Sequence, residues 1–223
     1  MDGTGQLFAE FVEALPHALT ATPVSYPSGR FLSYTQLLPL VNAAVPKEEA
    51  FVLLAESFST PLALAYAATN PPNLAALVLC AGFVGNPVGG WSGLVRLFAR
   101  PWLFRLRPPR WFLEYFLIGE NAHPGLIQKI RRALQVVRPQ VLSRRVQEAL
   151  DCDARNDLTR VAIPIMYLQG ANDRLLAASC RSDIFRVRPD IVSATIPAPH
   201  LLLQREPRKA ADVIVAFIQR LTV

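Results

Sequence analysis

Residues 51–69 constrain the fold of this chain more than any other part of the sequence. Phe51–Leu54 is a short apolar run typical of a buried β-strand, and Thr60–Thr69 has a helical pattern with Pro61 in its first turn, where a missing N–H costs nothing. Only a sharp turn around Ser57 separates the two. Such a turn pushes the serine hydroxyl out above the sheet, beside the free N–H groups and positive dipole end of the helix. The segment therefore predicts an activated serine nucleophile.

Two later strand-like runs each lead into a residue that can activate a serine. Ile163–Gly170 is followed at once by a turn that contains Asp173, and Ile191–Ile196 leads through three residues into His200. A histidine can accept the proton of a hydroxyl, and a carboxylate can hold the imidazole ring and stabilise its charged form. Ser57, Asp173 and His200, in that chain order, therefore predict a catalytic triad.

Elimination supports the histidine and the aspartate. The chain has only three histidines. His17 lies at the end of an early helix and His123 precedes a proline, so both are expected on the solvated surface. Asp183 lies in a helical pattern and Asp190 lies in a turn, so neither is expected to take the place of Asp173.

The segment Ala-Glu-Ser-Phe-Ser at residues 55–59 resembles the nucleophile elbow Gly-x-Ser-x-Gly of α/β-hydrolases. The first and last residues of the motif, Ala55 and Ser59, have small side chains, because strand and helix approach each other closely here. The order serine, aspartate, histidine also matches α/β-hydrolases and not the chymotrypsin or subtilisin families. The resemblance implies an α/β-hydrolase fold, as in small bacterial serine esterases with a helical cap. It also implies an acyl-enzyme on Ser57 and no cofactor.

Length and composition are consistent with a single cytoplasmic domain. The 223 residues, 52% of them hydrophobic, are enough for one core, and no apolar run approaches the roughly 20 residues of a transmembrane helix. The first residues lack the basic and apolar regions of a signal peptide. Cys80, Cys152 and Cys180 are scattered without metal or redox spacing, which favours a reducing compartment. No metal site is predicted.

Strand-like and helix-like runs alternate along the chain, which predicts a mostly parallel sheet with helices on both faces. Residues 1–83 and 151–223 are predicted to form this core. A capping box of Ser33 and Gln36 opens a helix that runs to Val45. The expected strands are Pro23–Tyr26, Phe51–Ala55, Leu74–Phe83, Ile163–Gly170 and Ile191–Ile196. The other expected helices are Gly5–Leu15, Pro124–Val137, Gln140–Leu150, Ala177–Val187 and Pro207–Leu221.

Residues 84–150 differ from the rest of the chain. They hold ten arginines and one lysine against three glutamates, and all three tryptophans. The resemblance to α/β-hydrolases implies a helical cap here, and the apolar content predicts an acyl pocket above Ser57. The expected lining residues are Trp91, Leu94, Phe98, Trp102, Phe104 and Phe116. The arginines are expected mostly to face solvent, because burial of an unpaired guanidinium is expensive. They are diluted among apolar runs with no nucleic-acid-binding motif, so nucleic acid is not an expected partner.

The N-terminal sequence Asp-Gly-Thr-Gly at residues 2–5 resembles a turn of some small α/β-hydrolases that supplies the second N–H of the oxyanion hole. By this resemblance the oxyanion hole consists of the N–H of Phe58 and a donor from Met1 or Asp2. The strand that precedes the turn in the family lies in the middle of the sheet, and it is absent here, as are the two strands before it. We therefore expect a sheet that is shortened at its N-terminal side.

The expected function is hydrolysis of a small-molecule carboxylic ester with a short to medium acyl chain. Two alternatives stay open. One is a thioesterase or an ester hydrolase acting on acyl carrier protein, with the arginine-rich cap docking the acidic carrier. The other is a non-catalytic binding protein on the hydrolase fold, whose oxyanion hole is lost with the missing strand. The sequence does not indicate an oligomeric state.

Overall fold

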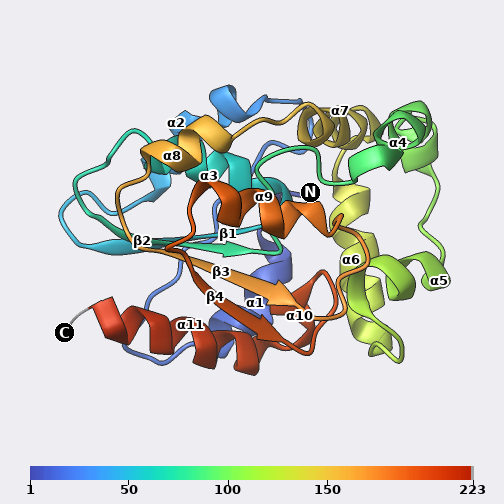
Figure 1. The fold of residues 1–223 in the computed structure, drawn as a ribbon. Helices are drawn as coiled ribbons and strands as arrows, with labels where there is room; N and C mark the ends of the chain where they lie inside the picture. The colour runs from blue at the N-terminus through green and yellow to red at the C-terminus, as the bar shows by residue number, and fades with distance from the viewer. Residues whose placement is uncertain (222–223) are drawn as a thin grey trace.

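A parallel four-stranded sheet forms the centre of the molecule. The computed structural model describes residues 1–221, and all three pairs of neighbouring strands are parallel. Parallel strands need crossover connections, and helices in these connections cover one face of the sheet, whereas helices near the two ends of the chain cover the other (Figure 1). The strands, in spatial order, are β1 (Phe51–Glu56), β2 (Leu74–Cys80), β3 (Ile165–Gly170) and β4 (Val192–Ile196).

Alternate strand residues supply two hydrophobic layers. In β2, Leu77 and Leu79 belong to one layer and Ala76 and Val78 to the other, and all four are fully buried. Burial on both faces explains why the strand is almost continuously apolar. The first layer is covered by α2 (Tyr34–Ala44), α3 (Thr60–Ala67), α8 (Arg155–Arg160) and α9 (Ser179–Val187). The second is covered by the 3-10 turn Gln6–Phe8, α1 (Ala9–Glu13), α10 (Leu202–Arg205) and α11 (Pro207–Leu221).

Residues 84–150, which we call the inserted segment, follow β2 and lie on the side of the carboxyl ends of the strands (Figure 1). Only the two longest helices of the segment, α6 (Pro124–Val136) and α7 (Pro139–Leu150), are predicted from sequence, and both begin with a proline at a first-turn position. The elements are the 3-10 turn Gly89–Trp91, α4 (Ser92–Phe98), the 3-10 turn Leu103–Arg105, α5 (Arg110–Leu113), the π-helical turn Glu114–Ile118, α6 and α7.

The capping box predicted at the start of α2 is present. The N–H of Gln36 donates to Ser33 Oγ at 3.4 Å, and the N–H of Ser33 donates to Gln36 Oε1 at 3.0 Å. These two bonds satisfy N–H groups that the helix itself leaves without a partner. Local sequence therefore predicts the start of α2, and the N–H of its first residue, Tyr34, donates in addition to Oε1 of Glu148 on α7 at 2.9 Å.

Two strand predictions differ from the structure. Residues 23–26 do not form a strand. Pro23 has no N–H, and the N–H of Tyr26 donates to the carbonyl of Gly3 at 2.7 Å instead of to a neighbouring strand. β2 ends at Cys80 and does not extend to residue 83, because Ala81 has a left-handed backbone (φ 45°) that an extended strand cannot continue.

β1 lies at the edge of the sheet, and its open side faces a large cavity. Among the strands of residues 1–221 it pairs with β2 alone, and all six of its residues line a cavity of about 2080 Å³. Successive strand residues point to opposite faces, so a cavity lined by six consecutive residues must follow the edge of the strand. The predicted shortening of the sheet at this side is therefore found in the structure.

One arginine of the inserted segment is an exception to the expected exposure. Arg145, on α7, is 1% exposed, and its guanidinium donates to the carbonyls of Met1 (2.9 Å), Asp2 (2.7 Å) and Pro27 (3.0 Å). The guanidinium also lies over the ring of Tyr26. Burial lowers the pKa of Arg145, and the carbonyl acceptors offset part of the cost of burying the charge. Arg145 thereby ties the N-terminal turn to the inserted segment.

Replacement of Arg145 by leucine is expected to destabilise the fold. Each buried carbonyl left without a donor costs about 1–3 kcal/mol, so the free energy of unfolding should fall by at least roughly 2 kcal/mol. Urea unfolding followed by circular dichroism measures the change. The neighbouring Arg144 is exposed and lies over the ring of Phe31, so Arg144→Ala should lower the free energy of unfolding by no more than about 1 kcal/mol. Equal stability of the two variants would show that the Arg145 hydrogen bonds do not hold the turn.

Candidate active site

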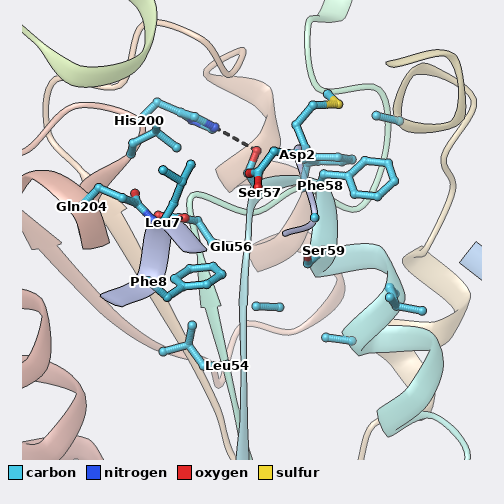
Figure 2. A pocket seen from close by; sticks show the side chains of 18 of the residues that line it. Asp2, Leu7, Phe8, Leu54, Glu56, Ser57, Phe58, Ser59, His200 and Gln204 are labelled. Carbon is cyan, nitrogen blue, oxygen red and sulfur yellow. Dashed lines mark hydrogen bonds between the residues drawn. The ribbon is translucent and has the colours of Figure 1, made fainter. Parts of the chain in front are cut away.

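Ser57 lies at the sharp turn where β1 passes into α3. Its backbone is in the left-handed region, with a φ of 54°, which residues with side chains rarely adopt. A 3-10 turn, Ser57–Ser59, connects it to Thr60, the first residue of α3. Strain of this kind costs about 1–3 kcal/mol and persists only where the surrounding structure fixes it. The turn directs the hydroxyl of Ser57 toward His200 (Figure 2).

Side-chain hydrogen bonds hold this strained turn from two sides. The hydroxyl of Thr60 donates to the carbonyl of Ser57 at 2.8 Å and lies 3.2 Å from the N–H of Phe83, which donates to it. The hydroxyl of Tyr26 donates to Ser59 Oγ at 2.9 Å. Ser59 therefore has two roles. Its small side chain fits the turn, and its hydroxyl binds Tyr26 and so fixes the segment around Tyr26.

The structure brings the three predicted triad residues together. His200 Nε2 lies 2.8 Å from Ser57 Oγ (Figure 2), and His200 Nδ1 lies 2.8 Å from Asp173 Oδ2. Asp173 comes from the loop after β3 and His200 from the loop after β4. Gly170, the last residue of β3, lets the two loops approach, because a Cβ there would lie 2.4 Å from two carbonyl oxygens of the loop before His200.

Hydrogen bonds keep Asp173 ionised although it is buried. Its Oδ1 accepts the N–H groups of Leu175 (2.9 Å) and Leu176 (3.1 Å), and its Oδ2 faces His200. Burial raises the pKa of the Asp173 carboxyl, but the interaction with His200 and the hydrogen bonds from the two backbone N–H groups outweigh it, so the pKa lies below the ordinary 3.8. An ionised Asp173 requires a proton on Nδ1 of His200, which leaves Nε2 to accept the hydrogen of Ser57.

The other histidine and aspartate candidates lie away from Ser57. His17 and His123 are exposed, and Nδ1 of His123 accepts the N–H of Gly125 at the start of α6. Asp183 and Asp190 form ion pairs with nearby arginines. None of these side chains adjoins Ser57.

Two backbone segments adjoin Ser57 and carry the residues predicted for an oxyanion hole. Phe58 follows Ser57 directly, and its ring is buried. The N-terminal turn places Asp2 beside Ser57 (Figure 2). Arg145 holds the carbonyls of Met1 and Asp2. Because C=O and N–H of a trans peptide point in opposite directions, the N–H group that follows each of these carbonyls points away from Arg145.

The cavity beside β1 reaches Ser57 and His200 and continues under the inserted segment. Trp102 does not line it, contrary to prediction, and its side chain, in the turn after α4, is 56% exposed on the surface. Leu7 and Phe8 also line the cavity (Figure 2) and are not among the residues predicted for it, because an amphipathic pattern does not separate core-facing from cavity-facing positions. The predicted residues that do line it are Trp91, Leu94, Phe98, Phe104 and Phe116.

A buried polar pair lies next to the serine and is not among the residues predicted from the sequence. Gln204, on α10, donates from Nε2 to Oε2 of Glu56, the last residue of β1, at 2.9 Å (Figure 2). The other carboxyl oxygen of Glu56 is buried without a hydrogen-bond partner in residues 1–221. Burial raises the pKa of Glu56 and outweighs the hydrogen bond from Gln204. The feature of the sequence that points to this pair is a carboxylate, Glu56, at the end of an otherwise apolar strand.

Substitution of Glu56 by glutamine is expected to change how stability depends on pH. With its raised pKa, the carboxyl stays protonated in the folded protein at pH values where it ionises in the unfolded chain. The unfolded state then binds fewer protons, so wild-type stability falls as pH rises above the ordinary value of 4.5. Glutamine keeps the shape without the ionisation. The stability of Glu56→Gln relative to wild type should therefore increase from pH 4.5 toward neutral pH, as measured by thermal unfolding. A difference that does not change with pH would contradict the raised pKa.

The cysteines have the properties of structural residues. All three are free, and Cys80 and Cys180 are buried. Burial raises the pKa of Cys152 to about 12 and that of Cys180 to about 11, so both thiols stay protonated at neutral pH. Residues 1–221 contain no group of three or more histidine, cysteine, aspartate or glutamate side chains that could hold a metal ion. Over the same range, no helix has the length and apolar character needed to cross a bilayer.

Solved structures of esterases and hydrolases share this architecture. A thermophilic esterase from Thermogutta terrifontis has a TM-score of 0.71 and 18% identity over 99% of this chain and 87% of that chain. A hydrolase from Oleispira antarctica has a TM-score of 0.79 and 14% identity over 98% of this chain and 88% of that chain. An esterase from Exiguobacterium antarcticum has a TM-score of 0.78 and 14% identity over 97% of this chain and 88% of that chain. No protein-family model and no curated protein matches the sequence. The likeness establishes the fold: this chain has the α/β-hydrolase fold.

Proposed function

We propose that this protein is a carboxylic ester hydrolase with Ser57, His200 and Asp173 as its catalytic triad. The observation that carries the proposal is the continuous chain of hydrogen bonds from Ser57 through His200 to Asp173, which starts at a serine on a strained turn. A serine that only capped a helix would accept a helix N–H, and neither the turn Ser57–Ser59 nor α3 has a side-chain cap bond. The esterases among the structural neighbours support hydrolysis on this fold.

The proposed reaction proceeds through an acyl-enzyme. His200 takes the proton of Ser57 while Oγ attacks the acyl carbonyl carbon, and Asp173 holds the ring and stabilises the imidazolium. The tetrahedral intermediate collapses as His200 gives the proton to the departing alcohol oxygen, which leaves the acyl group on Ser57. His200 then takes a proton from water, which attacks the acyl carbon, and a second collapse returns Ser57 and releases the acid.

Backbone N–H groups are proposed to bind the negative oxygen of each tetrahedral intermediate. One donor is the N–H of Phe58, and the other comes from the turn at Met1 and Asp2. Loss of a single donor of this kind typically costs roughly 2.7–4 kcal/mol of transition-state stabilisation. Arg145 supports the arrangement because it fixes the direction of the peptide groups in the turn.

The proposed substrate is a neutral ester with a short to medium acyl chain. The cavity that reaches Ser57 is lined mainly by apolar side chains, among them Leu94, Phe98 and Phe104 of the inserted segment. The inserted segment takes the role of a cap in this proposal. Each methylene that the pocket buries should contribute up to ~0.8 kcal/mol to binding.

Removal of the nucleophile or the base is expected to abolish hydrolysis of a p-nitrophenyl ester. Ser57→Ala and His200→Ala should each lower kcat by several orders of magnitude, since the triad acts as a unit. Asp173→Asn should also be severely impaired, because it leaves the imidazole in the wrong tautomer. More than about a tenth of wild-type activity in Ser57→Ala would contradict its role as nucleophile.

Matched controls accompany these variants. His17→Ala and His123→Ala change exposed histidines and should stay near the wild-type rate. A fluorophosphonate probe should label the wild type and not Ser57→Ala. A folded wild-type protein that neither reacts with the probe nor hydrolyses esters would instead be a non-catalytic binding protein on this fold.

A series of p-nitrophenyl esters with increasing acyl length tests the pocket. The specificity constant kcat/KM should rise by up to about fourfold for each added methylene, then fall once the pocket is full, and salt should change it little. A flat profile would indicate an open site. Rates that collapse on addition of salt would favour the second candidate, a thioesterase or carrier-protein hydrolase whose arginines recognise an acidic partner. An acyl-CoA and an acyl-carrier substrate, assayed beside the ester, separate these candidates directly.

A further inference from the structure

The inserted segment exposes a group of large apolar side chains that we call the apolar face. It includes the three tryptophans of the chain, which are 70%, 56% and 66% exposed in the order Trp91, Trp102 and Trp111. Its other main members are Leu97, Phe98 and Leu106. All lie on α4, on α5 or in the turns around them, which project from the carboxyl-end side of the sheet, away from α11 (Figure 1).

Exposure of this kind indicates contact with another apolar phase. Single apolar residues scattered over a surface are normal, whereas exposed apolar patches mark interaction sites. The main side chains of the apolar face all come from residues 91–111. The small hydrophobic cluster of the inserted segment around Leu113 and Ile118 is filled by other side chains. The apolar face is therefore not part of any of the buried clusters of residues 1–221.

Arginines alternate with these apolar residues. Five arginines lie between residues 91 and 115, against a single acidic residue, Glu114. Arg100, Arg105 and Arg107 are exposed, and none of them forms an ion pair with any of residues 1–221. The apolar face is therefore cationic as well.

We infer that the apolar face docks on the surface of an anionic phospholipid bilayer. Tryptophan and leucine side chains partition into the boundary between headgroups and acyl chains, and arginines beside them bind lipid phosphate groups. An acidic soluble protein would match the arginines but would leave the tryptophans in water. A neutral apolar surface would cover the tryptophans and leave the arginines unpaired. An anionic bilayer satisfies both groups at once.

The apolar face is continuous with the cavity that reaches Ser57. Trp91, Phe98 and Leu106 are exposed on the face and also line the cavity. An apolar ester dissolved in the bilayer could thus pass to Ser57 along apolar side chains without crossing bulk water. This consequence rests on the proposed esterase function, whereas the docking itself does not.

Vesicle binding tests the docking without any use of catalysis. The full chain carrying Ser57→Ala is mixed with vesicles of phosphatidylcholine alone, or of equal parts phosphatidylcholine and phosphatidylglycerol, at low and at high salt. Co-sedimentation measures the bound fraction. Because all three tryptophans lie on the apolar face, their fluorescence reports its environment directly. We expect binding to the anionic vesicles that weakens at high salt, together with a blue shift of the emission.

Two double substitutions separate charge from apolar contact. Arg100→Gln with Arg105→Gln should weaken binding to the anionic vesicles by roughly 25-fold, at about fivefold for each arginine. Leu97→Ser with Trp111→Ser should weaken it on the order of tenfold or more. None of these four residues lines the cavity, so both double variants should hydrolyse a water-soluble short ester at the wild-type rate.

A matched control removes the same charge elsewhere. Arg208→Gln with Arg220→Gln changes two exposed arginines of α11, away from the inserted segment, and should alter binding by less than about twofold. An equal loss in this control would show that net charge, and not the apolar face, attracts the vesicles, and would overturn the inference.

Three other results would overturn the inference. The first is a folded protein that hydrolyses soluble esters but does not bind the anionic vesicles, which would leave the proposed function standing. The second is binding to an acidic acyl carrier protein but not to vesicles. The third is self-association that Leu97→Ser with Trp111→Ser abolishes, without vesicle binding. Vesicle binding by a protein that hydrolyses no ester would support the docking and contradict only the proposed function.

Discussion

The left-handed turn at Ser57 is the backbone constraint around which the candidate site is arranged. A residue with a side chain at this φ costs about 1–3 kcal/mol, so other parts of the molecule must hold it. The hydroxyl groups of Thr60 and Tyr26 do so from opposite ends of the turn. Because the turn directs the Ser57 hydroxyl toward the ends of β3 and β4, its partners come from the loops that follow those strands. Asp173 and His200 occupy these two loops.

Local sequence predicts the parts of the molecule that depend on neighbours in the chain. Ser57 stands between an apolar strand and a helix with proline in its first turn, and Asp173 and His200 each follow a strand. Since parallel strands end at the same edge of the sheet, chain order alone places such residues near each other. The capping box of α2 is predicted for the same reason. For β2 only the predicted end differs from the structure. Ala81 ends the strand with a left-handed backbone, which an alanine in the sequence does not predict.

Long-range packing determined what the sequence could not predict. Nothing in the helical pattern of α7 separates the buried Arg145 from the exposed Arg144, because the three carbonyls that bind Arg145 come from residues more than 100 positions away. Residues 23–26 are apolar enough for a strand, but the N–H of Tyr26 donates to the carbonyl of Gly3 in the N-terminal turn and not to a neighbouring strand. Trp102 was expected in the acyl pocket on composition alone, and the turn after α4 places it on the surface.

The pairing of β1 along a single edge affects how the molecule unfolds. β2 and β3 have partners on both edges, whereas the strand that carries the serine is held along one edge only. Amide hydrogens of Phe51–Glu56 should therefore exchange with solvent faster than those of Leu74–Cys80, because a strand with one partner opens more often. Each opening of β1 moves Ser57 away from His200, whose loop follows β4, a strand that is likewise paired along one edge only. On warming, the contact between Ser57 and His200 should be lost in a local step, while the central strands β2 and β3 are still paired.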